Sequence, residues 1–219
     1  MHADVMRAIN VQINSEFTAW YQYLAMAAFC EREKFTGASQ WLKQQSLEEY
    51  QHGMKLFDFV LARNGIVELT KIEQPAREFE SFAEVFEIAL KQEEGVTAQI
   101  NSLYELCFQS KAFAEMTELQ WFLTEQVEEE KTSREIVARF RLVGDDPGSL
   151  LDLDRELGAR ATPSAKASRP STSTSRNVVP ERPLEAGWIR GEGGATRLSD
   201  APRCRSGCTD PRGVVCPRR

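Results

Sequence analysis

The chain has 219 residues, of which 42% are apolar, enough for one helical bundle of about 150 to 160 residues. Its net charge of −6 is uneven, because residues 1–158 hold 15 Lys and Arg against 28 Asp and Glu, whereas residues 159–219 hold 12 against 5. The acidic part argues against specific nucleic-acid binding, since phosphate affinity comes from clustered Lys and Arg. No run of 18 apolar residues and no signal-like N-terminus is present, so we expect no membrane span and a cytoplasmic protein.

Apolar periodicity predicts an all-α fold, a four-helix bundle followed by a short fifth helix. The expected helices cover, in chain order, about residues 4–34, 38–63, 81–109, 114–143 and 149–157. Ser81 and Glu84 form a capping box at the start of the third helix. The long connection before it, residues 64–81, contains Pro75 and is long enough to cross the bundle, so the second and third helices can lie parallel.

Each of the four long helices carries a carboxylate in the middle of an otherwise apolar stripe. Steps of three and four residues mark such a stripe as the buried seam of a bundle helix. The inward positions are Ile9, Ile13, Glu16, Trp20, Tyr23 and Ala27; Leu42, Gln45, Glu49, His52, Leu56 and Phe59; Phe86, Leu90, Glu93, Val96, Ile100 and Leu103; and Leu119, Phe122, Gln126, Glu129, Ile136 and Phe140.

The four seam carboxylates predict a buried site for two metal ions. An ionised carboxylate in a bundle interior costs several kcal/mol to desolvate unless positive charge meets it. None of the inward positions is Lys or Arg, so Glu16, Glu49, Glu93 and Glu129 need about four positive charges, which two divalent cations supply.

The second helix adds an imidazole to this set. Glu49 and His52 are three residues apart and project from one helix face, the spacing of the chelating pair in carboxylate-bridged di-iron bundles. Gln126 lies one turn before Glu129, at a place where a second His could stand. Oxygen ligands with a single nitrogen favour Fe²⁺ or Mn²⁺ over structural zinc. Tyr23 has two interpretations, core packing or a donor of a hydrogen bond or an electron to the site.

A second acidic group flanks the first. Glu48 adjoins Glu49, and Glu125 and Glu128 flank Gln126 and Glu129, each about 100° around its helix from a seam position. We interpret Glu48, Glu125, Glu128 and Glu129 as an entry or transfer site for a third cation. The alternative is a solvated acidic face.

Three segments resemble the helix motifs of bacterial non-haem ferritins, members of the ferritin-like di-iron family. They are Gln-Ile-Asn-Ser-Glu16-Phe, Leu-Glu48-Glu49-Tyr-Gln-His52, and Leu-Gln-Trp121-Phe-Leu-Thr-Glu125-Gln126-Val-Glu128-Glu129-Glu-Lys. The resemblance covers about residues 4–158. It implies a ferroxidase centre at Glu16, Glu49, His52, Glu93, Gln126 and Glu129, with Tyr23 beside it. It also implies a third iron site at Glu48, Glu125, Glu128 and Glu129.

The resemblance implies iron storage and detoxification in the cytoplasm. The family oxidises Fe²⁺ with oxygen or peroxide and stores ferric mineral inside a self-assembled cage of 24 subunits. Haem is not expected, because haem-binding relatives have a Met at the position of Tyr50 and a second Glu-x-x-His pair on the fourth helix. Two other functions remain open, a di-metal oxidase acting on an organic substrate and a non-catalytic helical binding bundle.

The last part of the chain departs from this family. From Ala159 onward Ser, Thr, Pro, Arg and Gly dominate and apolar periodicity ends, so the sequence predicts a disordered tail over residues 159–219 after a bundle domain over residues 1–158. An unstructured appendage is the preferred interpretation. Crowding of the cavity, polyanion binding and blocked assembly are the alternatives, and the spacing of Cys204, Cys208 and Cys216 does not match a rubredoxin module.

Overall fold

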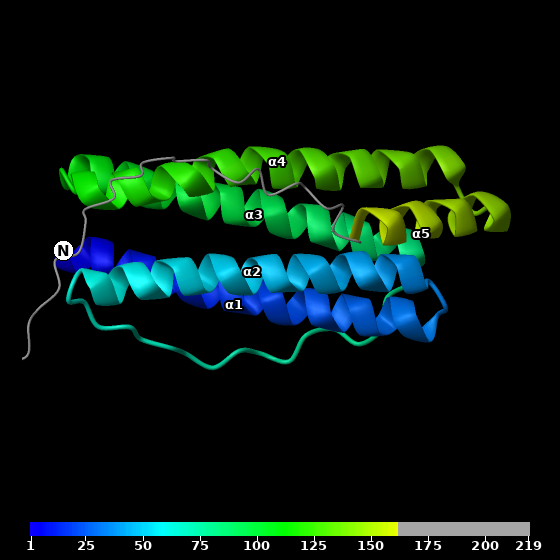
Figure 1. The fold of residues 1–219 in the computed structure, drawn as a ribbon, viewed down its shortest axis with the longest axis horizontal. Coiled ribbons are helices and arrows are strands. Elements are labelled where there is room, and N and C mark those ends of the chain that lie inside the picture. The colour runs from blue at the N-terminus through cyan, green and yellow to red at the C-terminus, as the bar shows by residue number, and fades with distance from the viewer. Residues whose placement is uncertain (162–219) are drawn as a thin grey trace, which may run out of the picture. The chain divides into compact units, whose positions relative to one another are not determined.

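The computed structural model describes residues 1–161, which form five helices (Figure 1). The helices are α1 (Ala3–Arg32), α2 (Thr36–Ala62), α3 (Phe82–Gln109), α4 (Phe113–Val143) and α5 (Pro147–Ala161). No strand occurs in residues 1–161, and the all-α prediction is confirmed. Within the same range no helix is both long and apolar enough to cross a membrane. The expected tail lies outside the described residues, except that α5 continues to Ala161, beyond the expected end at residue 157.

Three of the helices are followed, two residues after their last residue, by a residue with left-handed backbone. Lys34, Asn64 and Lys111 have φ angles of 71°, 53° and 51°. In each case the next N–H donates back to a carbonyl five residues earlier, a hydrogen bond that satisfies an orphaned helix-end acceptor. The break expected at residues 35–37 is therefore wrong by two positions: it falls at residues 33–35, because Lys34 makes the turn and Thr36 already begins α2.

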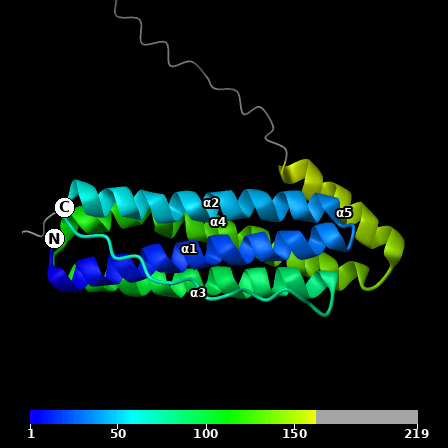
Figure 2. The ribbon, with the colours of Figure 1, turned by 90° about the horizontal axis from the view of Figure 1, so that it is seen from below.

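The helices are arranged as two antiparallel pairs. α1 packs on α2, α3 packs on α4, and α1 also packs on α3. The connection between α2 and α3 runs along the bundle and returns the chain to the end where α2 began, so α2 and α3 point in the same direction (Figures 1 and 2). The predicted four-helix bundle with one long crossover is confirmed.

Two asparagines on α1 hold this crossover in place. The Asn10 amide donates to the carbonyl of Ile66 over 2.9 Å and accepts from the N–H of Glu68 over 2.8 Å. The Asn14 amide does the same with Glu68 and Thr70, in each case over 2.7 Å. The two side chains thus provide backbone partners for a segment that has no neighbouring strand.

The core consists of two apolar clusters separated by a polar layer. One cluster includes Tyr23, Leu42, Phe86 and Ile136, and the other includes Ile13, Leu56, Val96 and Phe122. Each fully buried side chain of this size contributes about 1.5–3 kcal/mol. Along every long helix the seam carboxylate lies between residues of the two clusters. Trp20, Phe59 and Leu90 depart from the predicted seam, because they lie at its edges and are only half-buried.

The fifth helix is fastened to the start of α2. Pro147 opens α5, where its missing N–H costs nothing, and the Asp146 carboxylate accepts from the N–H of Ser149 over 2.8 Å. Asp154 accepts from the N–H of Ala38 over 2.8 Å and so caps α2. Gly37 permits this approach, since an added Cβ would lie 1.9 Å from the carbonyl oxygen of Asp154.

Candidate metal centre

Three side chains from two helices meet in the polar layer. Glu16 on α1 and Glu49 and His52 on α2 each place a ligand atom within 4.8 Å of the others. All three are buried, with 0%, 3% and 5% of their surface exposed. The helical spacing of Glu49 and His52 puts Nδ1 of the imidazole 3.6 Å from a carboxylate oxygen. This trio is the part of the expected ligand set that the structure brings together most closely.

The α1–α2 contact at this level depends on a residue without a side chain. Gly53 follows His52 and is buried. A Cβ added there would lie 2.6 Å from the ring of Phe17 and 3.3 Å from Cβ of Glu16. Gly53 therefore allows α1 to approach α2 closely enough for Glu16 to face the chelating pair.

Two oxygen atoms of the trio have no hydrogen-bond partner. They are Oε2 of Glu16 and Oε2 of Glu49, and both are buried. A buried carboxylate oxygen without a partner carries a desolvation cost that only a proton or a cation offsets. The donor set of carboxylate oxygens and one imidazole matches the ligand preference of Fe²⁺ and Mn²⁺, so these residues are suited to hold such an ion.

Glu93 and Gln126 complete the layer from α3 and α4. Tyr23 donates its hydroxyl proton to Oε1 of Glu93 over 2.5 Å. The amide of Gln126 donates to the Glu93 carbonyl over 3.3 Å and lies 3.4 Å from the hydroxyl of Thr97. Its N–H₂ group is therefore directed at α3, and its carbonyl oxygen is the atom left for a cation. Burial and the neighbouring Glu93 raise the pKa of Tyr23, so the phenol keeps its proton at neutral pH.

Burial, and then the crowding of carboxyl groups, raise the pKa values of the carboxylates in the polar layer. Burial first, and then the charge of Glu49, raise the pKa of Glu16 well above its ordinary value. Burial and then Glu93 raise the pKa of Glu49, and burial also raises that of Glu93. The pKa of Glu129 rises to about 8, with burial and then Glu93 as the main causes. Such groups bind cations readily, because a cation relieves the same repulsion that a proton relieves.

The second acidic group surrounds Glu129 at the margin of the layer. Glu48 and Glu125 are half-buried, Glu128 is exposed, and both Glu48 and Glu125 raise the pKa of Glu129. The amides of Gln44 and Gln45 donate to the two oxygens of Glu48, the former over 3.0 Å. The structure thus places Glu48 and Glu125 close enough to act on Glu129, and leaves Glu128 facing solvent.

Sequence reasoning missed two residues that contact the layer. Gln12, which is buried, donates to Oε1 of Glu16 over 2.7 Å. Its position four residues before Glu16 was the available signal, since residues i and i+4 share a helix face. Trp121 places its ring edge-on to His52, with centroids 5.2 Å apart, and so closes one side of the imidazole.

The sequence of the chain matches known proteins of one family. Residues 6–143 match the family model described as Ferritin-like domain. The chain is 36% identical over 157 residues to a bacterial non-heme ferritin of Staphylococcus aureus and 37% identical over 158 residues to one of Staphylococcus haemolyticus, covering 72% of this chain and 95% of each relative.

Solved structures of ferritins are also similar to this chain. An open-pore ferritin from the archaeon Archaeoglobus fulgidus superposes with a TM-score of 0.71 at 41% identity, covering 72% of this chain and 98% of that one. An engineered closed form of the same ferritin gives the same score and identity. The carboxylate layer, the crossover and these matches together show that the chain belongs to the ferritin family.

Proposed function

We propose that this protein is a ferroxidase that oxidises Fe²⁺ and stores the ferric product. The observation that carries the proposal is the pair of partnerless oxygens on Glu16 and Glu49 beside His52, buried inside the bundle. Relatives named as non-heme ferritins, at 36–37% identity over most of their length, support iron as the substrate.

In this proposal the polar layer holds two Fe²⁺ ions per subunit as substrates. Glu16, Glu49 and His52 bind one ion, Glu93, Gln126 and Glu129 bind the other, and carboxylate oxygens bridge the two. The layer exchanges its protons for the ions, because each carboxyl with a raised pKa is relieved by either. Tyr23 keeps Glu93 in position through its hydrogen bond. The carboxylates stabilise the higher charge of Fe³⁺ more than that of Fe²⁺, which favours loss of an electron from each ion.

The reaction balances with oxygen or peroxide as the acceptor. Two Fe²⁺ each give one electron to O₂, which takes two protons and becomes hydrogen peroxide. Two further Fe²⁺ reduce the peroxide, whose O–O bond breaks and which takes two protons to give two water molecules. The Fe³⁺ products leave past Glu129, where Glu48, Glu125 and Glu128 serve as a transfer site for a third ion.

Self-association completes the storage function. We propose a cytoplasmic cage of 24 copies, by the resemblance to bacterial non-haem ferritins, with the mineral in its cavity. The open pore is a feature of the Archaeoglobus fulgidus ferritin, and it supports a cage for this chain. The bundle, residues 1–158, carries the activity, and the tail, residues 159–219, is dispensable for it.

The test is a variant with Glu49→Ala and His52→Ala, compared with Glu94→Ala, an exposed carboxylate on α3. Two equivalents of Fe²⁺ per subunit are added without oxygen, air is admitted, and ultraviolet absorbance is followed. The double variant should fold, lose rapid oxidation and bind less Fe²⁺, while Glu94→Ala behaves as the unaltered protein. Unaltered kinetics in the double variant would refute the site.

Particle size separates the remaining functions. Fast oxidation in a particle of several hundred kDa supports storage, whereas fast oxidation in a small particle favours an oxidase of organic substrates. No iron binding at all favours an inert bundle. A chain truncated after Ala161, where α5 ends, should oxidise iron at the full rate.

A further inference from the structure

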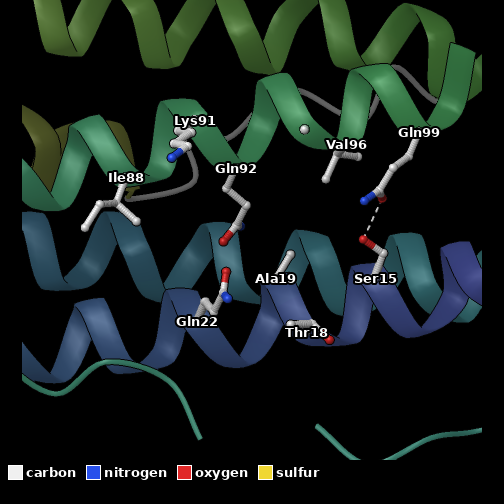
Figure 3. A pocket seen from close by; sticks show the side chains of 10 residues that line it. Ser15, Thr18, Ala19, Gln22, Ile88, Lys91, Gln92, Val96 and Gln99 are labelled. Atoms are coloured by element: carbon white, nitrogen blue, oxygen red, sulfur yellow. Dashed lines mark hydrogen bonds between the residues drawn. The ribbon is translucent and has the colours of Figure 1, made fainter. Parts of the chain in front are cut away.

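A groove lined by residues of α1 and α3 lies next to the polar layer. It has a volume of about 370 Å³ (Figure 3). Ala19 and Val96 line it, and each lies three residues after a seam carboxylate, Glu16 and Glu93. Because residues i and i+3 share a helix face, each side chain lies about one turn from its seam carboxylate, Ala19 on one side of the carboxylate layer and Val96 on the other. Both are buried, and Ala19 presents only a methyl group between the groove and the interior.

The wall of the groove holds an amide that lacks its hydrogen bonds. Both Oε1 and Nε2 of Gln92 are buried without a partner. Figure 3 shows Gln92 and Gln22 extending toward one another across the groove, from α3 and α1. An amide buried in this way carries a cost unless a small polar molecule with both donors and acceptors pairs with it.

The electrostatics of the groove are unfavourable for a metal ion. Of the ten residues that line it, the only charged one is Lys91, which is exposed at the rim. The acidic residues Glu48 and Glu125 lie on α2 and α4, the other two helices. A cation is therefore attracted more strongly to the α2–α4 side than to the groove.

We propose that this groove is the route by which hydrogen peroxide reaches the metal centre, with Gln92 as its binding residue on the way. Peroxide has two O–H donors and two acceptor oxygens, and matches both atoms of the Gln92 amide. Dioxygen has no hydrogen-bond donor, so it gains little binding energy from the Gln92 amide. The hydrogen bond from Ser15 to Gln99, over 2.6 Å, spans the groove near one end, whereas the space beside Gly95 is open, so the proposed entry is at Gly95. The inference rests on the proposed function, since it assigns a path to one of its oxidants.

Gly95 offers a way to fill the groove without disturbing the bundle. It is exposed on α3, and no atom lies within 4 Å of a Cβ added there. Any other residue except proline is a better helix former than glycine, so Gly95→Phe should fold. Ala98→Phe is the matched control, because Ala98 lies one turn further along α3 and lines the neighbouring hollow instead.

The experiment measures anaerobic Fe²⁺ binding and then the rate of oxidation by added hydrogen peroxide, in the whole protein and both variants. Gly95→Phe should bind as much Fe²⁺ as the unaltered protein and be oxidised several-fold more slowly, while Ala98→Phe should match the unaltered protein. An unchanged peroxide rate in Gly95→Phe overturns the route and leaves the ferroxidase proposal standing. Absence of oxidation in the unaltered protein overturns the ferroxidase proposal, and the route with it.

A second variant tests the amide itself. Gln92→Leu keeps the bulk of the side chain and removes its donors and acceptor. The peroxide concentration that gives half the maximal rate should rise about fivefold, the equivalent of one net hydrogen bond, with the rate under saturating peroxide unchanged. An unchanged half-saturating concentration shows that the amide pairs with water only and overturns the role of Gln92.

Discussion

The phenol of Tyr23 on α1 and the carboxylate of Glu93 on α3 are joined by a fully buried hydrogen bond of 2.5 Å. The bond crosses from one antiparallel pair to the other at the level of the proposed metal ligands. It holds one oxygen of Glu93 and leaves the second, which lies 3.5 Å from the Gln126 amide, as the freer one. In the proposed metal site, the tyrosine therefore leaves Oε2 of Glu93 as the oxygen for a cation.

Tyr23→Phe should weaken both the bundle and the site. Removing the hydroxyl leaves a buried acceptor unpaired, at a cost of about 1–3 kcal/mol in the free energy of unfolding. Fe²⁺ oxidation should slow, because Glu93 loses its fixed orientation. Urea unfolding and stopped-flow absorbance measure the two effects, and Tyr21→Phe, at an exposed position on α1, is the control. Equal stability and rate in both variants would remove Tyr23 from the site.

The metal-free protein should become less stable as the pH rises. The Glu129 carboxyl has a folded-state pKa of about 8 against an ordinary value of 4.5, so between these values the folded state binds more protons than the unfolded state. The contribution of Glu129 to the free energy of unfolding is therefore fully retained below pH 4.5 and is lost as the pH rises through 8. Raised pKa values of Glu16, Glu49 and Glu93 act in the same direction.

Urea unfolding of metal-free protein at pH 6 and pH 8.5 measures this loss, expected to be on the order of a few kcal/mol. Glu129→Gln should show a smaller pH dependence, because it removes one of the titrating groups. Mn²⁺ should restore stability at the higher pH, where the carboxylates are free of protons. A metal-free protein that gained stability over this range would contradict the account of the layer.

Gly53→Ala should separate α1 from α2 at the proposed metal ligands. The added methyl group meets the ring of Phe17 at 2.6 Å, and the helices must shift to relieve the overlap. We expect a loss of about 1–3 kcal/mol and weaker Fe²⁺ binding measured by anaerobic titration. Gly95→Ala is the control, and should be neutral or stabilising by up to about 1 kcal/mol. Full iron affinity in Gly53→Ala would show that α1 needs no close approach there.

The double variant Asn10→Ala and Asn14→Ala should release the crossover. Four hydrogen bonds to its backbone are lost, each contributing on the order of 1 kcal/mol. Trypsin should then cut faster after Lys71 and Arg77, which are exposed in this segment. Asn101→Ala, at an exposed position on α3, should leave the digestion pattern unchanged. Equal digestion of both proteins would contradict the role of the asparagines.

The fold could be predicted from the sequence because the residues that become buried recur at helical spacing. Glu16, Glu49, Glu93 and Glu129 lie among apolar residues at helical spacing, and burial follows from that spacing alone. The Ser81 cap was also readable, and its hydroxyl accepts from the N–H of Glu84 over 3.1 Å.

What sequence did not reveal depends on partners distant along the chain. Asn10 and Asn14 pair with backbone more than 50 residues away, and no local pattern predicts that contact. The turn at Lys34 was misplaced because lysine is an uncommon residue in left-handed backbone. The unpaired amide of Gln92 was invisible for the same reason, since it depends on how α1 and α3 pack.

The two asparagines of α1 also help to fix the position of the proposed metal ligands along the bundle axis. A bundle helix that slipped by one turn would move about 5.4 Å and still bury apolar residues. Such a slip of α1 would carry Glu16 out of reach of His52. It would also break the hydrogen bonds that the Asn10 and Asn14 side chains form with the backbone of residues 66–70. The crossover thus fixes the position of α1 along the bundle axis, and surface hydrogen bonds thereby set the level at which Glu16 lies in the interior.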